Sequence, residues 1–217
     1  MKTLLLLGPR HCEDLRVIAD TARALGLPTV ICTGNFGDEL PERVHYACED
    51  DVILSYRGRW VLPKHVIDNA GLALNIHPGP PEWRGIGCVN QALYSNAQEY
   101  GCTLHHVAPA LDSGPICGVV RFDVKPSDTV ESVLRRTYAH MLRIALNVVG
   151  DVAVGAPFPA DPSYAWSPTL YTRKELDALA AITLDMPPAE IERRIRATTF
   201  GKWKPTLAIG GKQYPIG

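Results

Sequence analysis

Several patterns that would indicate a function directly are missing from this chain of 217 residues. Its six cysteines are spread out without a C-x-x-C pair, so neither a zinc cluster nor a disulfide framework is expected. None of them lies in a motif with a paired base, which argues against a cysteine nucleophile. A G-x-G-x-x-G motif is also missing, and a dinucleotide cofactor is therefore not expected.

The chain also has almost no net charge and no long apolar run. The formal net charge of −1 leaves no broad basic face for nucleic acid, although it does not exclude a small basic pocket for a phosphorylated ligand. Four consecutive leucines stop at Gly8 and Pro9, too few for a signal-peptide core or a membrane span. We therefore expect a cytoplasmic protein that binds neither nucleic acid nor membranes.

The chain does contain the residues of a full core, arranged as alternating strands and helices. Hydrophobic residues make up 46% of the sequence, enough for a folded domain. Apolar runs predict strands at residues 2–7, 29–33, 51–56, 72–76, 101–107 and 116–124. Apolar stripes and end signals predict helices at residues 12–26, 63–70, 88–97 and 128–152. This alternation predicts an α/β fold in which helices cover both faces of a mainly parallel sheet.

The composition changes after the long helix. Residues 155–168 are rich in proline and predict a connector. Two short helices are predicted next, in the segments TRKELDALAAI and PPAEIERRIRATTF, and a β-hairpin follows. We therefore divide the chain into a main domain at 1–154 and a C-terminal appendage at 155–217.

The segment LNIHPGPPEWRGIG, residues 74–87, places polar side chains where an apolar strand ends. Asn75 and His77 are two residues apart and so face the same side of the strand. Ligands of open α/β sheets bind at the carboxyl ends of the strands, and the prolines after His77 limit how the loop can move. Taken alone, N-x-H-P fits a polar strand end with a proline-rich turn better, because short motifs often occur by accident.

Three later features give this motif a context. The segment WRGIG follows at a short interval, GCTLHHV predicts a strand at 101–107, and ALDSGPI places Asp112 in a tight turn before another strand. An amide, an imidazole and a carboxylate at successive strand ends can converge on one point. The sequence therefore predicts a polar site built from Asn75, His77 and Asp112.

In this order and spacing, the motifs N-I-H-P, R-G, G-x-T-x-H and L-D-S-G-P-I resemble the folate-dependent formyltransferases. That family includes methionyl-tRNA, glycinamide ribonucleotide and sugar N-formyltransferases, and the resemblance covers about residues 50–125. It implies a Rossmann-like formyltransferase catalytic domain with a mixed, mainly parallel sheet, which uses 10-formyltetrahydrofolate as co-substrate and no metal. The family's Asn-His-Asp triad falls on Asn75, His77 and Asp112, and its further histidine falls on His105.

The chemistry of formyl transfer fits these residue types. A primary amine attacks the formyl carbon, whose oxygen becomes negatively charged. His77 and the Asn75 amide can donate hydrogen bonds to that oxygen, and losing one such donor typically costs about 100- to 1,000-fold in rate. Asp112 can hold the protonation state of the imidazole and help to move the proton of the amine. For His105 we expect a supporting role next to the triad, although a hydrogen-bonded structural histidine explains it as well.

The resemblance also implies where the two substrates bind. The segment SYRGRWVLP corresponds to one wall of the family's pterin slot, and the turn after Leu111 would close the other side. The residues assigned to the donor are Trp60, Val61, Leu62, Asp112, Ser113 and Gly114. The residues assigned to the acceptor are Pro78, Gly79 and Arg84, in a segment that lacks the two leucines of many members. Trp60 fits a core aromatic equally well, and Arg84 a loop salt bridge.

The tail narrows the choice of acceptor. Methionyl-tRNA formyltransferases usually carry a larger C-terminal barrel for tRNA, and the tail here is not strongly basic. Purine-pathway members present a Gly-rich phosphate loop where this chain has Gly8-Pro9-Arg10. With Tyr171 at the start of one helix and Arg194 and Arg196 on another, the ending looks like that of sugar N-formyltransferases. We therefore expect a nucleotide-linked amino sugar, made for a bacterial surface glycan.

Several alternatives stay open at this point. The acceptor can be another amine: a purine precursor, an amino acid or methionyl-tRNA. A non-enzymatic module that binds folate or sugar could keep the same fold, although the intact Asn75, His77 and Asp112 argue against it. At least one of Arg194 and Arg196 fits a solvated helix face.

The hairpin indicates an oligomer. In TLAIGGKQYPI, residues 206–216, Leu207 and Ile209 alternate with more polar positions that include Lys212, and the turn falls on Gly210 and Gly211. A lone hairpin is marginal in water and needs a surface to pack on. We expect a homodimer in which the hairpins help to pair two subunits, with folding back onto its own core as the alternative.

Overall fold

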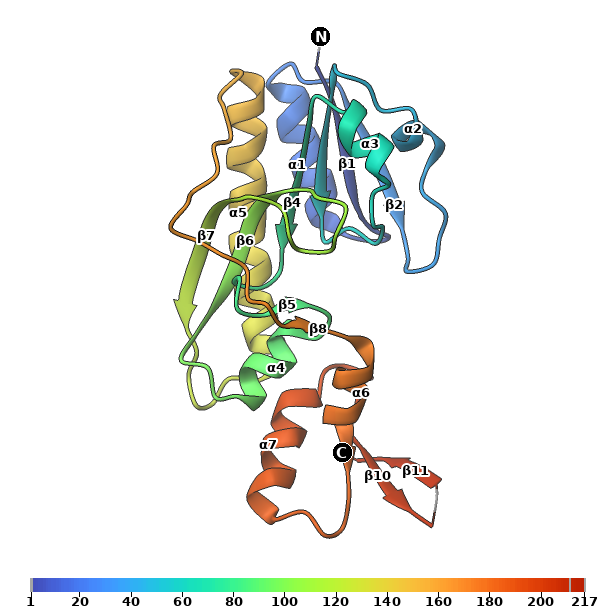
Figure 1. The fold of residues 1–217 in the computed structure, drawn as a ribbon, viewed down its shortest axis with the longest axis vertical. Coiled ribbons are helices and arrows are strands. Elements are labelled where there is room, and N and C mark those ends of the chain that lie inside the picture. The colour runs from blue at the N-terminus through green and yellow to red at the C-terminus, as the bar shows by residue number, and fades with distance from the viewer. Residues whose placement is uncertain (1, 211, 217) are drawn as a thin grey trace.

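The computed structural model describes residues 2–210 and 212–216 and shows an α/β fold around a six-stranded sheet (Figure 1). The strands follow the order β2-β1-β3-β4-β6-β7. Their bounds are β1 Thr3–Pro9, β2 Thr29–Gly34, β3 Asp51–Tyr56, β4 Leu72–His77, β6 Glu99–His106 and β7 Ile116–Asp123. β1 to β4 pair in parallel, whereas β6 runs antiparallel to β4 and to β7. The expected mixed, mainly parallel sheet is confirmed.

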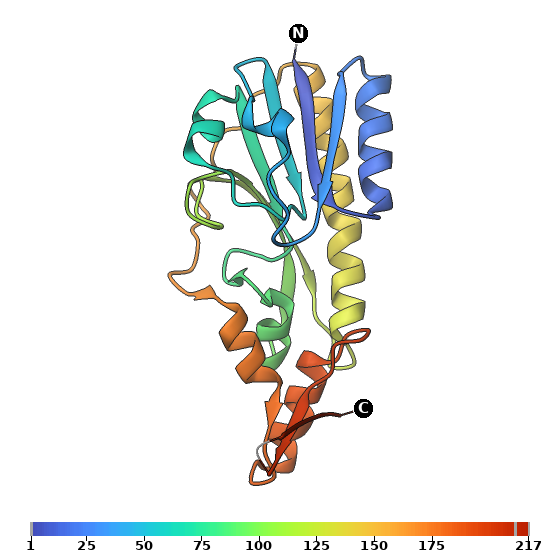
Figure 2. The ribbon, with the colours of Figure 1, turned by 90° about the vertical axis from the view of Figure 1, so that its right-hand side faces the viewer.

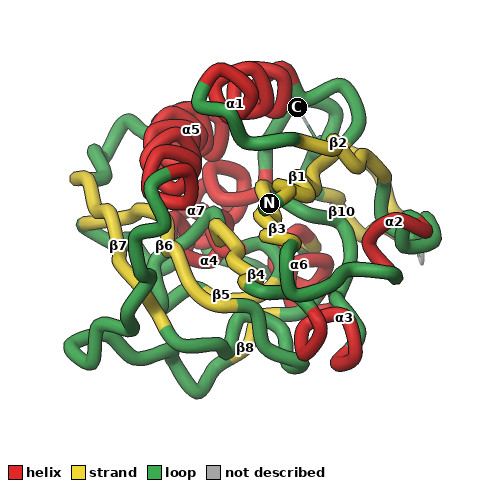
Figure 3. Tube along the Cα trace, turned by 90° about the horizontal axis from the view of Figure 1, so that it is seen from above, coloured by secondary structure: helices red, strands yellow, loops and turns green. Residues whose placement is uncertain are grey.

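Helices cover both faces of this sheet (Figure 3). α1, Glu13–Ala24, and α5, Val130–Ala153, lie on one face, and α2, Glu42–His45, and α3, Lys64–Asn69, lie on the other. Alternate side chains of β1 serve the two layers: Leu4 and Leu6 join the core beneath α1 and α5, and Leu5 and Leu7 join the core beneath α2 and α3. Burial on both faces explains why these strands are continuous apolar runs.

β1, β3 and β4 end at one edge of the sheet, which faces the C-terminal part of the chain (Figures 1 and 2). The loops at this edge hold strained backbone. His11 after β1 and Arg57 after β3 have positive φ angles of 59° and 55°, and Asp112, in the turn between the antiparallel strands β6 and β7 that reaches back to His77, has a φ of 45°. Such conformations are uncommon for residues other than glycine and often occur at functional sites.

The proline-rich segment after α5 returns along β7 to this edge. The Asp161 N–H donates to the Ile116 carbonyl at 2.7 Å, and the Ser167 N–H donates to Pro81 at 3.1 Å. The short strand β8, Leu170–Tyr171, then pairs with β5, Arg84–Gly85. The connector is thus held against the main domain through most of its course, while the boundary at residues 154 and 155 stays a prediction.

The appendage holds two helices and a small sheet at the far end of the molecule (Figure 2). Its elements are α6 Arg173–Ala180, β9 Ala181–Ile182, α7 Pro188–Thr198, β10 Thr206–Ile209 and β11 Lys212–Pro215. β9 pairs with β10, so the hairpin belongs to a three-stranded sheet within the described ranges. The hairpin thus pairs with a strand of its own chain, in line with the alternative of packing within one subunit, and the homodimer stays a prediction. Across the described residues, no helix combines the length and apolar character needed to cross a membrane.

Two local predictions need correction, and a third can be followed only in part. Tyr171 lies in β8 and does not begin a helix; Thr172 caps α6 through a capping box with Glu175, because its hydroxyl accepts the Glu175 N–H. Lys212 pairs with Ile209 and so lies on the same face of the hairpin, not the opposite one. Of the predicted turn, Gly210 has a positive φ of 56° and Gly211 lies outside the described residues.

Candidate active site

Asn75 and His105 meet across neighbouring strands. They are register partners on β4 and β6, and Asn75 Nδ2 lies 2.9 Å from His105 Nε2. His105 Nδ1 lies 2.8 Å from the carbonyl oxygen of His106, which can only accept a hydrogen bond. His105 therefore carries its proton on Nδ1 and accepts an N–H of Asn75 at Nε2. Burial lowers the pKa of His105 to about 4, so the ring is neutral, and Asn75 keeps its second N–H for another acceptor.

His77 and Asp112 form a buried ion pair. His77 Nδ1 lies 3.2 Å from Asp112 Oδ2, and the side chains are only 4% and 5% exposed. His77 Nε2 lies 2.9 Å from the Trp83 carbonyl oxygen, so both ring nitrogens face acceptors and the ring carries two protons. Burial opposes this charge, but the Asp112 carboxylate, aided by Cys88, raises the pKa of His77 well above its ordinary value. Burial likewise opposes ionisation of Asp112, but His77 and the Gly85 N–H lower its pKa.

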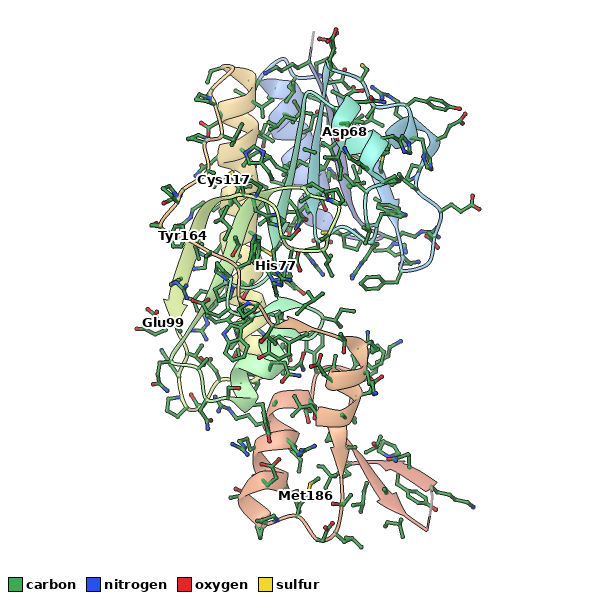
Figure 4. All side chains as sticks on the ribbon, in the orientation of Figure 1. Asp68, His77, Glu99, Cys117, Tyr164 and Met186 are labelled. Carbon is green, nitrogen blue, oxygen red and sulfur yellow. The ribbon has the colours of Figure 1, made fainter. Side chains whose placement is uncertain are left out.

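The predicted convergence of amide, imidazole and carboxylate is present. Asp112 Oδ1 lies 3.8 Å from His105 Nε2, which links the Asn75–His105 contact to the His77–Asp112 pair. The four side chains belong to β4, to β6 and to the turn that follows β6. Figure 4 places His77 at the edge of the sheet that faces the C-terminal part of the chain.

The loop after His77 is fixed by hydrogen bonds and close packing. The Pro78 carbonyl accepts from the Tyr100 hydroxyl and the Gly79 carbonyl from the Thr103 hydroxyl, each at 2.8 Å. A Cβ at Gly79 would stand 2.9 Å from His77 Nε2 and 2.8 Å from the Trp83 carbonyl oxygen. Glycine is therefore required there, because any side chain would press on the catalytic candidate.

The turn at 110–114 is equally constrained. The Ser113 hydroxyl donates to the Ala110 carbonyl at 2.8 Å, and a Cβ at Gly114 would stand 1.8 Å from the His106 carbonyl oxygen. Arg84 Nη1 donates to the Asp112 carbonyl at 3.3 Å. The predicted salt bridge of Arg84 is not found among the described residues, and its buried Nε has no hydrogen-bond partner there.

Trp166 was not predicted and lies in the site. Its indole Nε1 donates to the Gly114 carbonyl at 2.8 Å. The ring stands edge-on to His105 and His77, with centroid separations of 4.9 and 5.7 Å. A tryptophan in a proline-rich connector is a weak signal of packing, and no local pattern indicates where that connector returns.

Cys88 is a second unexpected neighbour. At the start of α4, Cys88–Tyr94, its Sγ lies 3.7 Å from His77 Nε2 and donates to the Gly85 carbonyl at 3.1 Å. No sequence motif pairs a cysteine with a base, and this contact arises from the fold; because the His77 ring carries two protons, it does not act as a base for the Cys88 thiol. No cluster of three or more histidine, cysteine or acidic side chains within the described ranges is placed to hold a metal ion.

The predicted donor segment follows β3 without regular secondary structure. Leu62 is buried in the core beneath α3, and the Trp60 indole donates to the carbonyls of Asp38 and Glu39 at 3.0 and 3.1 Å. Val61 is 63% exposed. Trp60 thus has the contacts of a partly buried core aromatic, and the assignment of this segment to the pterin stays a prediction.

Arg194 and Arg196 of the appendage form hydrogen bonds with backbone carbonyls of other segments. Arg194 is 18% exposed, pairs with Glu190, and donates to three carbonyls at the end of α6. Arg196 donates to the carbonyls of Lys125 and Asp128 before α5. Neither is merely a solvated face of α7.

Comparison with curated proteins finds methionyl-tRNA formyltransferases. The proteins of that name from Mycobacterium tuberculosis and Acidothermus cellulolyticus are 36% and 35% identical to this chain over 141 residues. The matches cover 63% of this chain and 43% and 41% of those proteins. The chain therefore spans less than half the length of the curated relatives it matches.

Solved structures share the fold over nearly the whole chain. A sugar N-formyltransferase from Shewanella has a TM-score of 0.82 at 16% identity and covers 99% of this chain and 96% of its own. A 4-N formyltransferase from Francisella tularensis gives 0.78 at 16% identity, covering 100% and 96%. The Helicobacter canadensis N-formyltransferase, solved with folinic acid and dTDP-3-aminofucose, gives 0.76 at 14% identity, covering 98% and 86%.

The family model for formyl transferases matches residues 34–149, more than half of the chain and the part that carries the Asn75, His77, His105 and Asp112 cluster. With this match, the motifs and the shared fold in agreement, the chain belongs to the formyl transferase family.

Proposed function

We propose that this chain is an N-formyltransferase that moves a formyl group from 10-formyltetrahydrofolate to the primary amine of a nucleotide-linked amino sugar, for surface glycan synthesis. The observation that carries the proposal is the buried cluster of Asn75, His77 and Asp112 at the carboxyl edge of the sheet. Such a cluster offers hydrogen-bond donors and a proton acceptor within one water-poor site, which suits transfer of an acyl group.

The donor supplies the formyl carbon and its oxygen, and this chain supplies the groups that respond to the change in charge. Asn75 uses one N–H to hold His105, and the second N–H is free to donate to the oxygen as it becomes negative. Because His105 fixes the amide through a neutral acceptor nitrogen, Asn75 cannot turn its carbonyl oxygen toward His105 without losing that bond. His105 is thus a positioning residue.

His77 supplies a second donor. Its Nε2–H now bonds to the neutral Trp83 carbonyl, and a negatively charged oxygen is the stronger acceptor, so the bond can be exchanged during the reaction. Asp112 keeps the ring charged through Oδ2 and retains Oδ1 to accept a proton from the attacking amine. The bond between the formyl carbon and the donor nitrogen then breaks, and tetrahydrofolate leaves as that nitrogen takes up a proton.

The donor would lie between the loop that carries Trp60, Val61 and Leu62 and the turn Asp112-Ser113-Gly114. On the acceptor side we place Pro78, Gly79 and Arg84, whose buried Nε and remaining guanidinium donors suit an oxygen-rich ligand. The likeness of the whole chain, appendage included, to sugar N-formyltransferases supports an amino-sugar acceptor.

Methionyl-tRNA is the second candidate acceptor. It is favoured by the 36% identity with methionyl-tRNA formyltransferases, higher than the identity with any of the sugar enzymes described above. The shared part covers 63% of this chain, so the identity bears on the transfer chemistry more than on the choice of amine.

A panel of amines tests the proposal. The enzyme is incubated with 10-formyltetrahydrofolate and, in parallel, with amino-sugar nucleotides, methionyl-tRNA, glycinamide ribonucleotide and free amino acids. Release of tetrahydrofolate and the mass of the product are followed, with Asp112→Asn as the matched inactive control. We expect formylation of an amino-sugar nucleotide. Preference for methionyl-tRNA would make methionyl-tRNA the acceptor in place of the amino sugar. No turnover with any amine would indicate that the chain is a binding module.

A further inference from the structure

Within residues 2–210 and 212–216, two arginines at the active edge of the sheet have no anionic partner. Arg57 and Arg59 follow β3 directly, and both are half-buried. Among the described residues neither forms an ion pair, and Arg59 donates no hydrogen bond to the protein. The one polar contact of the Arg57 guanidinium is with Cys12 Sγ, at 3.9 Å. Arginine is seldom buried without a partner, so these guanidinium groups require an explanation.

Aromatic rings hold both groups in place. Arg57 Cζ lies 3.8 Å from the centroid of the Tyr138 ring on α5, and Arg59 Cζ lies 4.5 Å from that of Phe36, after β2. These contacts orient the planar groups without supplying a counter-charge. Burial lowers the pKa of Arg59, and the like charge of Arg57 lowers it further. A bound anion would relieve both costs.

The backbone places the start of this arginine loop next to the strand that carries the catalytic candidates. Arg57 has a positive φ of 55°, which is unfavourable for an arginine. It follows Tyr56, whose register partner on β4 is Ile76, the residue before His77. Neighbouring strands lie about 5 Å apart, so the arginine loop begins about 5 Å from the strand of Asn75 and His77, which is about the width of a sugar ring.

We propose that Arg57 and Arg59 bind the phosphate groups of the acceptor while its amine reaches Asn75, His77 and Asp112. The inference deepens the proposed function and rests on it, since it assigns the nucleotide-sugar phosphates to a place. Two forked guanidinium groups on one loop, near enough for the charge of Arg57 to lower the pKa of Arg59, match the oxygens of adjacent phosphates. The carboxylates of the folate donor are anions too, and the experiment separates the two sources.

Isothermal titration calorimetry with inorganic pyrophosphate tests the site without turnover. The wild type is compared with Arg57→Asn, since asparagine tolerates a left-handed backbone, and with Arg59→Gln. We expect the dissociation constant to rise by roughly ten- to a hundredfold in each variant. Arg16→Gln is the matched control, because the Arg16 side chain is 86% exposed on α1, and it should bind as the wild type does. An unchanged affinity in Arg57→Asn and Arg59→Gln would overturn the proposal.

The same proteins are titrated with folinic acid, whose affinity we expect to fall by a clearly smaller factor than that of pyrophosphate, although both arginines lie in the segment assigned to one wall of the pterin slot. If folinic acid weakens and pyrophosphate does not, the arginines serve the donor and the proposal is wrong. Arg57→Lys and Arg59→Lys keep the charge but lose the fork; retention of part of the pyrophosphate affinity supports the assignment and guards against loss of folding. If no amine is ever formylated but pyrophosphate binding still depends on both arginines, the proposed function fails while the anion site stands.

Discussion

Two buried histidines on adjacent strands hold different charges, and their partners decide which. His77 faces a carboxylate at one nitrogen and a carbonyl at the other, so it stays protonated. His105 faces a carbonyl at Nδ1 and an amide N–H at Nε2, so it stays neutral. A charged donor and a neutral orienting group thus stand side by side, as a site for developing negative charge requires.

The charge of Asp112 can be removed with little disturbance of the backbone. Its φ of 45° is one that asparagine also tolerates, so Asp112→Asn changes the charge and keeps the turn. We expect kcat to fall by about 100- to 10,000-fold, and NMR of the His77 ring to show its pKa lowered once the carboxylate is gone. Asp68→Asn, which removes an exposed partner of Lys64, is the control and should change neither. Near wild-type kcat in Asp112→Asn would exclude Asp112 from the mechanism.

His105 gives stability a pH dependence of known sign. Its pKa is about 4 in the folded protein and about 6.5 in the unfolded chain, so its contribution is complete above pH 6.5 and is lost as the pH falls toward 4. Urea unfolding should show a loss of up to about 1.4 kcal/mol per pH unit in this window. His105→Gln should show a shallower dependence; His140, whose pKa is also lowered, remains in both proteins. Parallel curves for the two proteins would contradict a neutral, buried His105.

The close packing of Gly79 in the loop after β4 predicts how a substitution there affects activity. Gly79→Ala should reduce kcat by at least about tenfold, because the new methyl group would stand 2.9 Å from His77 Nε2 and must displace it. Gly150→Ala in α5 is the matched control: a Cβ there meets nothing within 4 Å, so activity should be unchanged and stability equal or slightly higher. Steady-state kinetics and thermal melts of both variants separate a loss of activity from a loss of stability. A fully active Gly79→Ala would show that this loop can move freely.

The contacts of Trp166, in the connector that returns along β7, lead to a second prediction about activity. Trp166→Phe keeps an aromatic edge against His105 but loses the bond to the Gly114 carbonyl. Losing such a bond costs about 1 kcal/mol, so we expect a severalfold loss of kcat/KM, with a larger loss in Trp166→Ala. Tyr46→Ala, which truncates an aromatic side chain that is 74% exposed, should have no effect. Equal activity of all three variants would mean that the connector only covers the sheet.

These elements also show what sequence can and cannot place. The alternation along β4 was enough to put Asn75 and His77 on one side, and the strand–helix order was enough for the sheet. The four residues of α2 and the two of β5 are too short for any periodic pattern. Trp166 bonds to Gly114, which lies 52 positions earlier, and no local signal encodes such a contact. Propensity and spacing report neighbours along the chain, whereas this contact depends on the path of the whole connector.

In the molecule as a whole, the C-terminal hairpin exposes an apolar surface that no other part of the described chain covers. It lies at the end of the molecule farthest from α1 and α2 (Figures 1 and 2), and in the part of the chain that the structure describes its strand neighbour is the short β9. Apolar side chains nevertheless remain exposed there: Trp203 at 58%, Ile209 at 47% and Tyr214 at 48%. β11 is also an edge strand, and exposed apolar edges tend to pair.

We therefore expect the full chain to form a homodimer through the hairpin, with Ile209 and Tyr214 on the buried face. A closed pairing of two such faces buries both sets of apolar side chains at once, which a monomer leaves in water. The double variant Ile209→Ser and Tyr214→Ser should sediment as a monomer at concentrations where the wild type is a dimer. Val154→Ser is the control, because Val154 is 80% exposed but lies at the end of α5, outside the hairpin, and it should leave the dimer intact. A monomeric wild type, or a double variant that still dimerises fully, would show that this apolar face has another purpose.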